Sequence, residues 1–291
     1  MISIITITYN RAHLIRETIQ SVLEQTYRDF EYVIVDDGSE DNTEEVVNSF
    51  KDDRIAYYKL PKTGYLSKLR NFALEKVSSK YVAFVDSDDL WEKEKLQIQF
   101  DILENDTSLG FCFCDVLIFR ETAIVKEKLY SAESNNFYYK ANMFNEYITS
   151  KLSLYPSAIM IRKDCFDVLG KQDQTMQSGD HDFMCRLMFQ YKGCIIYSSL
   201  VKIRKHDKNH SSLAGILCFD EYIITLEKFY RRKLITNKIY RTMVSDNLYQ
   251  SGILYYRNAS YRNAKEKFIK SFNMNIFNYK GFIRYLMCFF K

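Results

Sequence analysis

Short apolar runs rich in β-branched residues alternate with helical patterns over the first 85 residues. Strands are expected at residues 2–8, 30–35, 55–60 and 81–85, and helices at residues 13–25, 42–50 and 65–77. Asn10 is expected to cap the first of these helices. This alternation constrains the fold more than any other feature, because successive right-handed βαβ units build a parallel sheet covered by helices. The runs at 30–35 and 81–85 are almost continuously apolar, as expected for strands buried on both faces. We therefore predict an α/β fold with a Rossmann-like βαβ sheet flanked by helices.

The remainder of the chain continues this pattern and then becomes helical. Strands are expected at 110–119 and 157–161 and around Ile195 and Val201, helices at 92–104, 142–150 and 181–191, and an irregular segment at 121–140. From residue 219 onward the patterns are helical almost to residue 291. Composition and charge place a boundary near 211–215, which predicts an α/β domain at 1–215 and a helical C-terminal extension at 216–291.

Charge is distributed unevenly between these two parts. The 291 residues carry a net charge of +4, with 47% hydrophobic and 27% charged residues, as expected for a chain that is folded throughout. Residues 219–291 hold 14 Lys and Arg against 5 Asp and Glu, a balance of +9, which leaves −5 for residues 1–218. The helical extension is therefore the basic part of the protein.

Seven cysteines are scattered through apolar runs, and their odd number argues against a disulfide framework. Cys112 and Cys114 lack the spacing and the second pair of a zinc site, so we expect reduced packing residues. The chain begins without the charged and apolar regions of a signal peptide, and no stretch reaches the roughly 18 apolar residues of a transmembrane helix. We expect a cytoplasmic protein that could contact the inner face of the cell membrane only peripherally.

Three polar clusters directly follow predicted strands. They are Tyr9-Asn10-Arg11, Asp36-Asp37-Gly38 and the run from Asp86 to Asp89. In open α/β sheets, ligands bind beyond the carboxyl ends of the strands. We therefore expect the three clusters to line one crevice.

The run Asp86-Ser87-Asp88-Asp89 places three carboxylates within four residues. Such carboxylates repel one another unless a cation is present, and hard oxygen ligands suit Mg²⁺ or Mn²⁺. The same run would also serve as a capping cluster for the helix after Trp91, because Asp is favoured at helix N-termini. Taken alone, the run leaves both interpretations open.

The run Asp36-Asp37-Gly38-Ser39 also has two interpretations. A strand-to-helix turn needs Gly for a positive φ and Ser or Asp to cap the next helix. A nucleotide-binding crevice instead needs a carboxylate that accepts a hydrogen bond from a base or a ribose. The order and spacing of the two acidic runs, each at the end of a strand, favour the second interpretation.

Together these motifs resemble family 2 of the inverting glycosyltransferases, which have the GT-A fold. The resemblance covers about residues 1–212 and rests on Ile7-Thr8-Tyr9-Asn10-Arg11, Val35 to Ser39 with Asp41 and Thr43, Gly64, Arg70-Asn71 and Ala73, Tyr81 to Asp89, Gly179 to Phe183 with Arg186, Arg204-Lys205-His206, Asn209 and Ser211. Residues 219–291 lie outside it.

The resemblance implies transfer of a sugar from a nucleotide sugar, with a UDP-sugar favoured, to a saccharide or lipid-linked acceptor in polysaccharide or glycoconjugate synthesis. A hexosyltransferase or an N-acetylhexosaminyltransferase is expected. The implied donor-binding residues are Thr8, Tyr9, Asn10, Arg11, Asp37, Arg70 and Asp86. Mn²⁺ or Mg²⁺ would be held by Asp86, Asp88 and His206, although an exposed loop histidine is the other interpretation of His206.

Asp180 matches the aspartate of the family's Glu-Asp pair, which is the catalytic base. An inverting transfer needs a carboxylate to take the acceptor proton as the hydroxyl attacks the anomeric carbon. Gly179 stands where the family has Glu, which leaves Asp182 and His181 as alternative bases. The departure also motivates a second hypothesis, a non-catalytic nucleotide-sugar-binding module. A nucleotidyltransferase is disfavoured, because the Gly-rich loop expected after its first strand is missing.

The basic extension leaves two interpretations open. Aromatic and aliphatic residues mix with Lys and Arg over residues 279–291, as in an interfacial helix that binds anionic lipid. A small helical bundle with its lysines on a solvated face is the alternative. Nucleic acid is not expected as a partner, because no recognition motif accompanies the basic residues.

Overall fold

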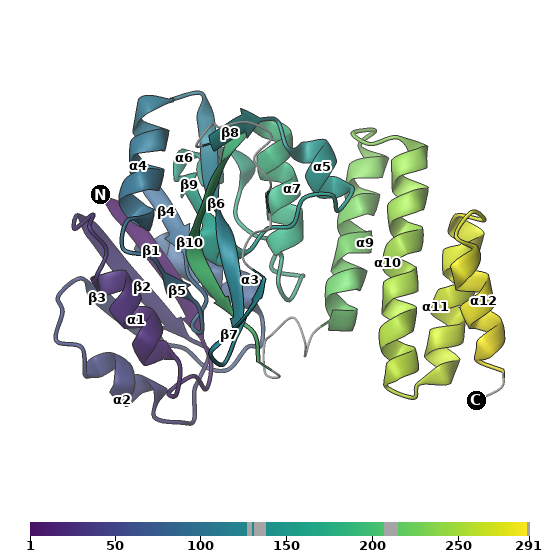
Figure 1. Cartoon of the computed structure of the whole chain (residues 1–291), viewed down its shortest axis with the longest axis horizontal. Helices are drawn as coiled ribbons and strands as arrows, with labels where there is room; N and C mark the ends of the chain where they lie inside the picture. Colours follow the sequence, from purple (N-terminus) through teal and green to yellow (C-terminus); the bar gives the residue numbers. More distant parts are fainter. Residues whose placement is uncertain (127–129, 131–137, 207–214, 290–291) are drawn as a thin grey trace. The chain divides into compact units, whose positions relative to one another are not determined.

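The computed structural model describes residues 1–126, 130, 138–206 and 215–289 (Figure 1). It divides into two units, Met1–His206 and Asp207–Lys291. The boundary predicted near 211–215 lies, apart from Gly215, outside the described residues, as do Asn209 and Ser211.

Ten strands of the first unit form one sheet in the described part of the chain (Figure 1). The strands are β1 Ile2–Thr8, β2 Phe30–Asp36, β3 Ile55–Lys59, β4 Tyr81–Phe84, β5 Leu90–Trp91, β6 Leu109–Arg120, β7 Ala123–Lys126, β8 Tyr138–Ala141, β9 Ile159–Arg162 and β10 Lys192–Arg204. Their order is β3-β2-β1-β4-β9-β6-β10-β5, with β7 beside β6 and β8 beside β10.

The first four strands are parallel, as the βαβ alternation predicts. The sheet as a whole is mixed, because β9 lies antiparallel to both β4 and β6. This reversal places the beginning of β9 at the carboxyl end of β4, since Met160 pairs with Ala83. Residues just before β9 therefore reach the polar segment that follows β4.

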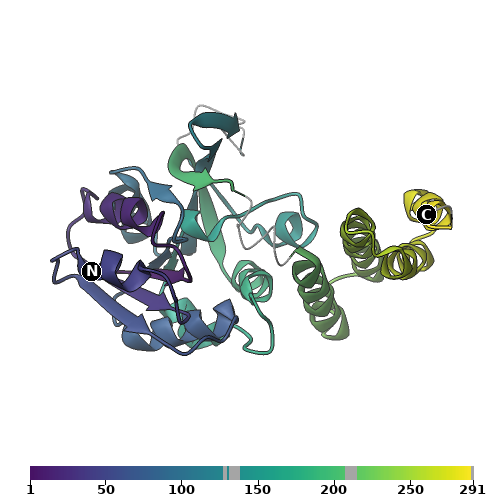
Figure 2. The same ribbon diagram turned by 90° about the horizontal axis from the view of Figure 1, so that it is seen from below.

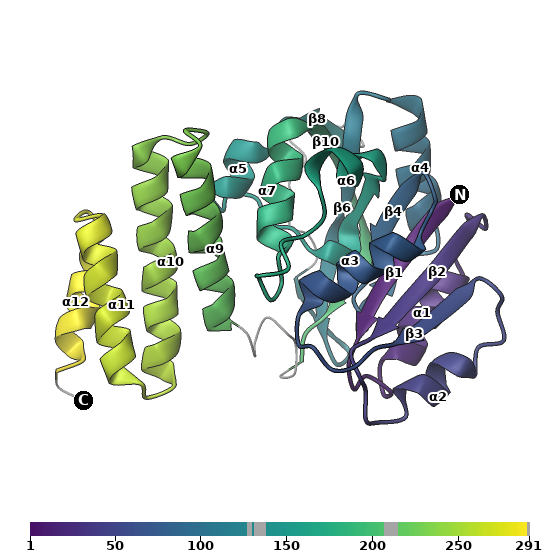
Figure 3. The same ribbon diagram turned by 180° about the vertical axis from the view of Figure 1, so that it is seen from behind.

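Helices cover both faces of the sheet. They are α1 Ile15–Leu23, α2 Thr43–Asn48, α3 Leu66–Lys76, α4 Lys95–Asn105, α5 Phe144–Ile148, α6 Asp164–Leu169 and α7 Asp180–Gln190. On one face, α1 and α4 share a core with Ile2 and Ile4 of β1. On the other, α3 lies against β1 and β2 (Figure 3). Alternate residues of β1 are buried on opposite faces, and its polar residues Ser3, Thr6 and Thr8 are buried as well.

Three local predictions differ from the structure. One bulged strand, β10, replaces the two short strands expected around Ile195 and Val201, because its register against β6 shifts between Ile196 and Val201 without ending the pairing. The segment expected to be irregular contains β7 and β8. Asn10 does not cap α1; its Oδ1 instead accepts a hydrogen bond from the Glu40 amide at 2.8 Å.

The cysteines are all free, and all of them except Cys218 are buried, as expected for packing residues. Cys112 and Cys194 lie side by side on β6 and β10 within the core of the sheet.

The second unit is helical, as expected for residues 216–291. Its helices are α9 Gly215–Arg231, α10 Asn237–Arg257, α11 Tyr261–Met274 and α12 Tyr279–Met287. Each packs on the next along the chain, and Figure 2 shows them nearly end-on. Gly252 allows α10 to approach α11, because a Cβ there would stand 2.6 Å from the Phe268 ring. In the described residues, no helix is both long enough and apolar enough to cross a bilayer.

Candidate functional site

The loop after β1 is bound to the loop after β2 through a set of backbone-to-side-chain hydrogen bonds. The Asn10 amide donates to Ser39 Oγ at 2.8 Å, and the Arg11 amide donates to Thr43 Oγ1 at 3.0 Å. Asn10 has a positive φ of 50°, which Asn tolerates better than most residues. Two of the polar clusters expected to share a crevice are therefore adjacent.

The two carboxylates after β2 have different partners. Asp36 is fully buried and accepts from the Ser39 amide and from the Tyr57 hydroxyl, both at 2.6 Å. Gly38 has φ +75°, and a Cβ there would stand 2.9 Å from the Lys62 backbone nitrogen. Asp36 and Gly38 therefore build the turn, as the structural interpretation of this run expects.

Asp37 instead holds the loop that precedes α3. Its Oδ1 accepts from the Thr63 amide at 2.7 Å, and its Oδ2 accepts from the Gly64 amide at 2.9 Å. Lys62 Nζ lies 3.2 Å from Asp37 Oδ2 and 2.8 Å from the centre of the Tyr9 ring. Tyr9 remains 37% exposed, so its ring could stack with a planar ligand if Lys62 moved away.

Thr8 has an unusual hydroxyl at the end of β1. Its Oγ1 is buried and has no hydrogen-bond partner among the described residues. Native proteins rarely leave such groups unsatisfied, and a bound ligand or water is the usual partner.

The acidic run after β4 does not cap α4. That helix begins at Lys95 with Glu94 at the N-cap position and without a side-chain cap, so the capping interpretation is wrong. Asp89 Oδ2 accepts from Ser157 Oγ at 2.5 Å, and its Oδ1 accepts from the Arg204 amide at 3.1 Å. Burial, with the nearby charge of Asp86, raises the pKa of Asp89 well above its usual value.

Asp86 and Asp88 are the other two carboxylates of the run. Asp88 Oδ2 lies 2.9 Å from His206 Nε2 and 3.9 Å from Arg11 Nε. The Asp86 side chain is partly exposed. Its pKa is nevertheless raised to about 6, mainly because protein atoms surround the carboxylate closely and secondly because of the charge of Asp88. The two carboxylates therefore repel each other in this arrangement.

This donor set fits a divalent cation whose remaining positions are filled by a ligand. In the part of the chain that the structure describes, no three His, Cys, Asp or Glu side chains are arranged to hold a metal by themselves. Asp86 and Asp88 are hard oxygen donors whose repulsion a cation would relieve, and the His206 imidazole already contacts Asp88. Mg²⁺ and Mn²⁺ suit such sites, because they are commonly held by one or two carboxylates together with phosphate oxygens.

Asp180 is the first residue of α7, and three side chains orient its carboxylate. Its Oδ1 accepts from Arg70 and from Gln172 Nε2, the latter at 3.2 Å, and its Oδ2 accepts from Ser178 Oγ at 2.9 Å. The charges of Arg70 and Asp180 both act on Asp86, so the two side chains lie within electrostatic range of the acidic run.

The two alternative bases lie in different surroundings. The Asp182 side chain is 5% exposed and bonds Arg186 at 2.9 Å, whereas that of Asp180 is 29% exposed. His181 is buried and stacks on Tyr147, and burial lowers its pKa to about 4. Asp180 is therefore the most accessible of the three.

Gly179 has a structural reason to be glycine. Its backbone has φ +69°, and a Cβ there would stand 3.1 Å from Ser67 Cβ on α3. The contact is close because α3 binds this loop directly. The Ser67 amide donates to the Gln177 carbonyl at 3.1 Å, and the Asn71 amide group exchanges two hydrogen bonds with the Gln172 backbone at 2.8 and 2.9 Å.

Sequence patterns did not single out Ser67, Ser157 or Gln172. Ser157 bonds residues 68 and 71 positions away in the chain, and Gln172 bonds Asn71 across 101 positions. Gln172 Oε1 is buried without a partner in the described residues. No local motif signals such contacts, which only the folded chain creates.

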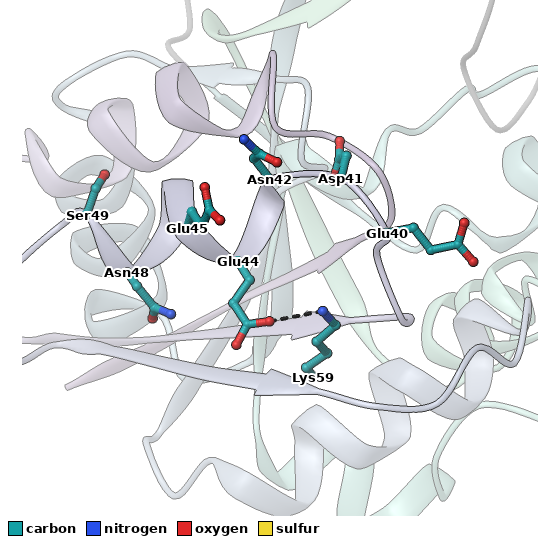
Figure 4. Close-up of a pocket in the computed structure, with 8 residues that line it drawn as sticks. All are labelled: Glu40, Asp41, Asn42, Glu44, Glu45, Asn48, Ser49 and Lys59. Carbon is teal, nitrogen blue, oxygen red and sulfur yellow. Dashed lines mark hydrogen bonds and ion pairs between the residues drawn. The ribbon is translucent and has the colours of Figure 1, made fainter.

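A separate pocket of about 620 Å³ lies beside α2 and β3 (Figure 4). It is lined by Glu40, Asp41, Asn42, Glu44, Glu45, Asn48, Ser49 and Lys59. Lys59 is bound to Glu44 at 2.9 Å, so the remaining carboxylates dominate its charge. This pocket contains none of the predicted site residues, and its acidity disfavours a phosphate ligand.

This chain is similar in sequence to a family of known proteins. The model of the family described as Glycosyl transferase family 2 matches residues 3–170. The putative teichuronic acid biosynthesis glycosyltransferase TuaG of Bacillus subtilis is 38% identical over 115 residues, which are 39% of this chain and 45% of TuaG. WfgD of Escherichia coli, described as a UDP-Glc:alpha-D-GlcNAc-diphosphoundecaprenol beta-1,3-glucosyltransferase, is 36% identical over 125 residues, 43% of this chain and 49% of WfgD. The matched segments span about half the length of these relatives.

Solved structures share the fold. The crystal structure of Staphylococcus aureus TarS 1-349 in complex with UDP-GlcNAc aligns with a TM-score of 0.70 at 17% identity, over 94% of this chain and 81% of TarS. This likeness confirms the GT-A fold expected from the sequence. The family model matches more than half of the residues of this chain, and the chain therefore belongs to glycosyl transferase family 2.

Proposed function

We propose that the protein is an inverting glycosyltransferase that moves a hexose or N-acetylhexosamine from a nucleotide diphosphate sugar to an acceptor hydroxyl. The observation that carries the proposal is the Asp180 carboxylate held by Arg70, since the charges of both side chains act on Asp86 in the acidic run after β4. Family membership supports the reaction class.

The donor nucleotide would bind between the loops that follow β1 and β2. Tyr9 offers an exposed ring for the base, and the Thr8 hydroxyl lacks a partner in the described chain. Asp37 would contribute a carboxylate that also holds the Thr63 and Gly64 amides. Asn10 and Arg11 shape the loop after β1. A UDP-sugar is favoured, which the UDP-GlcNAc complex of TarS supports.

Asp86, Asp88 and His206 would hold Mn²⁺ or Mg²⁺. The ion would supply positive charge for the diphosphate that leaves the sugar. Arg70 adds a buried guanidinium beside the same carboxylates, so cationic charge is available to the leaving group from the protein itself.

Asp180 would act as the general base. The acceptor oxygen forms a bond to the anomeric carbon, the bond from that carbon to the diphosphate oxygen breaks, and the acceptor proton passes to the Asp180 carboxylate. Arg70, Gln172 and Ser178 hold this carboxylate in one orientation. Its exposed fraction leaves room for an acceptor hydroxyl.

The acceptor would be a saccharide, either free or linked to a lipid. The name of WfgD, whose acceptor is a diphosphoundecaprenol-linked sugar, supports the lipid-linked form. We include peripheral membrane contact through the helices after residue 215 in this proposal, because such an acceptor lies at a bilayer surface.

The test compares Asp180→Asn with Asp88→Ala and a control, Asp101→Asn. Asp101 is an exposed carboxylate on α4 that accepts from Gln97 at 2.9 Å, a bond like that between Asp180 and Gln172. With Mn²⁺ and a panel of UDP- and GDP-sugars, we expect Asp180→Asn to bind the donor but lose transfer at least 100-fold. Asp88→Ala should weaken Mn²⁺-dependent donor binding. Donor binding without turnover by the unaltered protein, under every acceptor, would favour the non-catalytic module.

A further inference from the structure

Exposed apolar side chains gather on α12 and on the turn that leads into it. Phe277 is 85% exposed and Ile276 is 63% exposed, although neither contributes to a core cluster. On α12, Tyr279, Ile283 and Leu286 are also exposed. Soluble monomers rarely leave contiguous apolar surface of this kind without a partner.

These residues form one face of α12. Tyr279, Phe282, Ile283, Leu286 and Met287 occupy positions i, i+3, i+4, i+7 and i+8 of α12, so they lie on the same side of the helix. All five are exposed to solvent in the second unit. This face therefore remains uncovered although its helix is packed in a bundle.

The opposite side of α12 supplies the packing. A Cβ at Gly281 would stand 3.2 Å from the Phe268 carbonyl on α11, and Cys288 shares a core cluster with Ala264 and Phe268. Asn278 Nδ2 donates to Ser271 Oγ at 3.2 Å and anchors the start of the helix. Tyr285 packs against the same cluster, and the Phe282 ring lies 5.1 Å from that of Phe272 on α11. Tyr279, Ile283 and Leu286 nevertheless remain between 44% and 61% exposed.

Cationic side chains border the apolar face. Lys280 and Arg284 are one turn apart on α12, next to the exposed residues. Lys265 Nζ lies 3.1 Å from the centre of the Phe289 ring. Residues 247–291 contain eight Lys and Arg and only one acidic residue, Glu266, a balance of +7.

This positive charge distinguishes two candidate binding partners of the exposed face, a second copy of the chain and an anionic lipid surface. A second copy of the chain would bring a balance of +7 against +7, which opposes association. An anionic lipid surface attracts the same cations and also accepts the apolar side chains.

We propose that the exposed face of α12, with Phe277 in the turn before it, binds a bilayer that contains anionic phospholipid. Phe277, Ile283 and Leu286 enter the boundary between headgroups and acyl chains. Lys280 and Arg284 contact the lipid phosphates. The proposal deepens the membrane contact of the proposed function and names its surface and its lipid chemistry, but it does not require catalysis.

The test is cosedimentation of the whole protein with lipid vesicles. We expect binding to vesicles of phosphatidylcholine mixed with phosphatidylglycerol and much weaker binding to phosphatidylcholine alone. Phe277→Ser with Ile283→Ser should lower the affinity about tenfold per residue. Lys280→Gln with Arg284→Gln should lower it about fivefold per residue and remove the preference for the anionic lipid.

A matched control replaces exposed apolar residues of the first unit. Ile124 and Val168 are 55% and 66% exposed, and Ile124→Ser with Val168→Ser should leave vesicle binding unchanged. Circular dichroism should show that all variants stay folded, because every substituted side chain has solvent access.

Three results would overturn the proposal. They are absence of binding to the anionic vesicles, equal loss in the control and in the α12 variants, and self-association without lipid that Phe277→Ser with Ile283→Ser abolishes. Vesicle binding is measured without donor or acceptor, so an inactive protein that still binds anionic vesicles would refute the proposed reaction alone.

Discussion

Gly179→Ala tests why glycine stands before the candidate base. At φ +69°, a residue with a Cβ costs roughly 1–2 kcal/mol. The new Cβ would also stand 3.1 Å from Ser67 Cβ, a contact that the α3 backbone can relieve only by moving. Overpacking of this kind adds about 1 kcal/mol. We therefore expect Gly179→Ala to lower the free energy of unfolding by about 2–3 kcal/mol.

Gly170→Ala is the matched control. Gly170 has φ +74°, nearly the same as Gly179, but no atom lies within 4 Å of the position of its Cβ. The cost of the left-handed backbone is thus present without the close contact. The difference between the two variants measures the close contacts at position 179, of which the one with Ser67 is the shortest, and we expect about 1 kcal/mol.

The assay is urea denaturation followed by tryptophan fluorescence. Trp91 is the only tryptophan of the chain and is buried in the first unit, so the signal reports on the unit that contains both glycines. Transfer activity should fall in Gly179→Ala because Asp180 is the next residue, and it should fall less in Gly170→Ala.

Equal free energies of unfolding for the two variants would refute the inferred contact. A Gly179→Glu variant that is as stable as the unaltered protein would refute the larger claim that the backbone here requires glycine.

Three further predictions concern buried side chains. Gln172→Met should lower kcat and leave the donor KM unchanged, because it removes a hydrogen bond to Asp180, whereas Gln97→Met should change neither kinetic constant. Burial lowers the pKa of His181 from 6.5 to about 4, so its contribution to stability is lost as pH falls from 6.5 to 4, and urea denaturation of His181→Asn should show a smaller loss. Burial lowers the pKa of Lys95 from 10.5 to about 8. The free energy of unfolding should therefore increase as the pH is raised from about 8 to 10.5, relative to that of Lys95→Met.

Local patterns predicted most of the first unit. The strands from β1 to β4 lie within a residue or so of the expected ranges, because alternating burial and β-branched residues are local signals. The same logic placed Tyr9, Asp37 and Asp86 at one edge of the sheet, since the parallel strands that precede them end together.

Predictions of hydrogen-bond partners were less successful. Asn10 and the acidic run after β4 both have the composition of helix caps, yet neither caps a helix. A capping preference means that a side-chain oxygen is able to accept a hydrogen bond from a helix amide. Here the same oxygens accept hydrogen bonds from other backbone amides and side chains. The bulges of β10 were likewise invisible, because they depend on its pairing with β6.

The sequence by itself determined the order of strands and helices as far as β4, the family and the position of the acidic runs, because each depends on residues that are close along the chain. Only the tertiary structure decided which groups hold Asp180, why residue 179 is glycine and which face of α12 stays exposed. Arg70 and Asp180 are separated by 110 positions, and their contact exists only after α3 and the start of α7 pack together. On α12 both sides carry apolar residues, so the packing against α11 decides which side remains exposed.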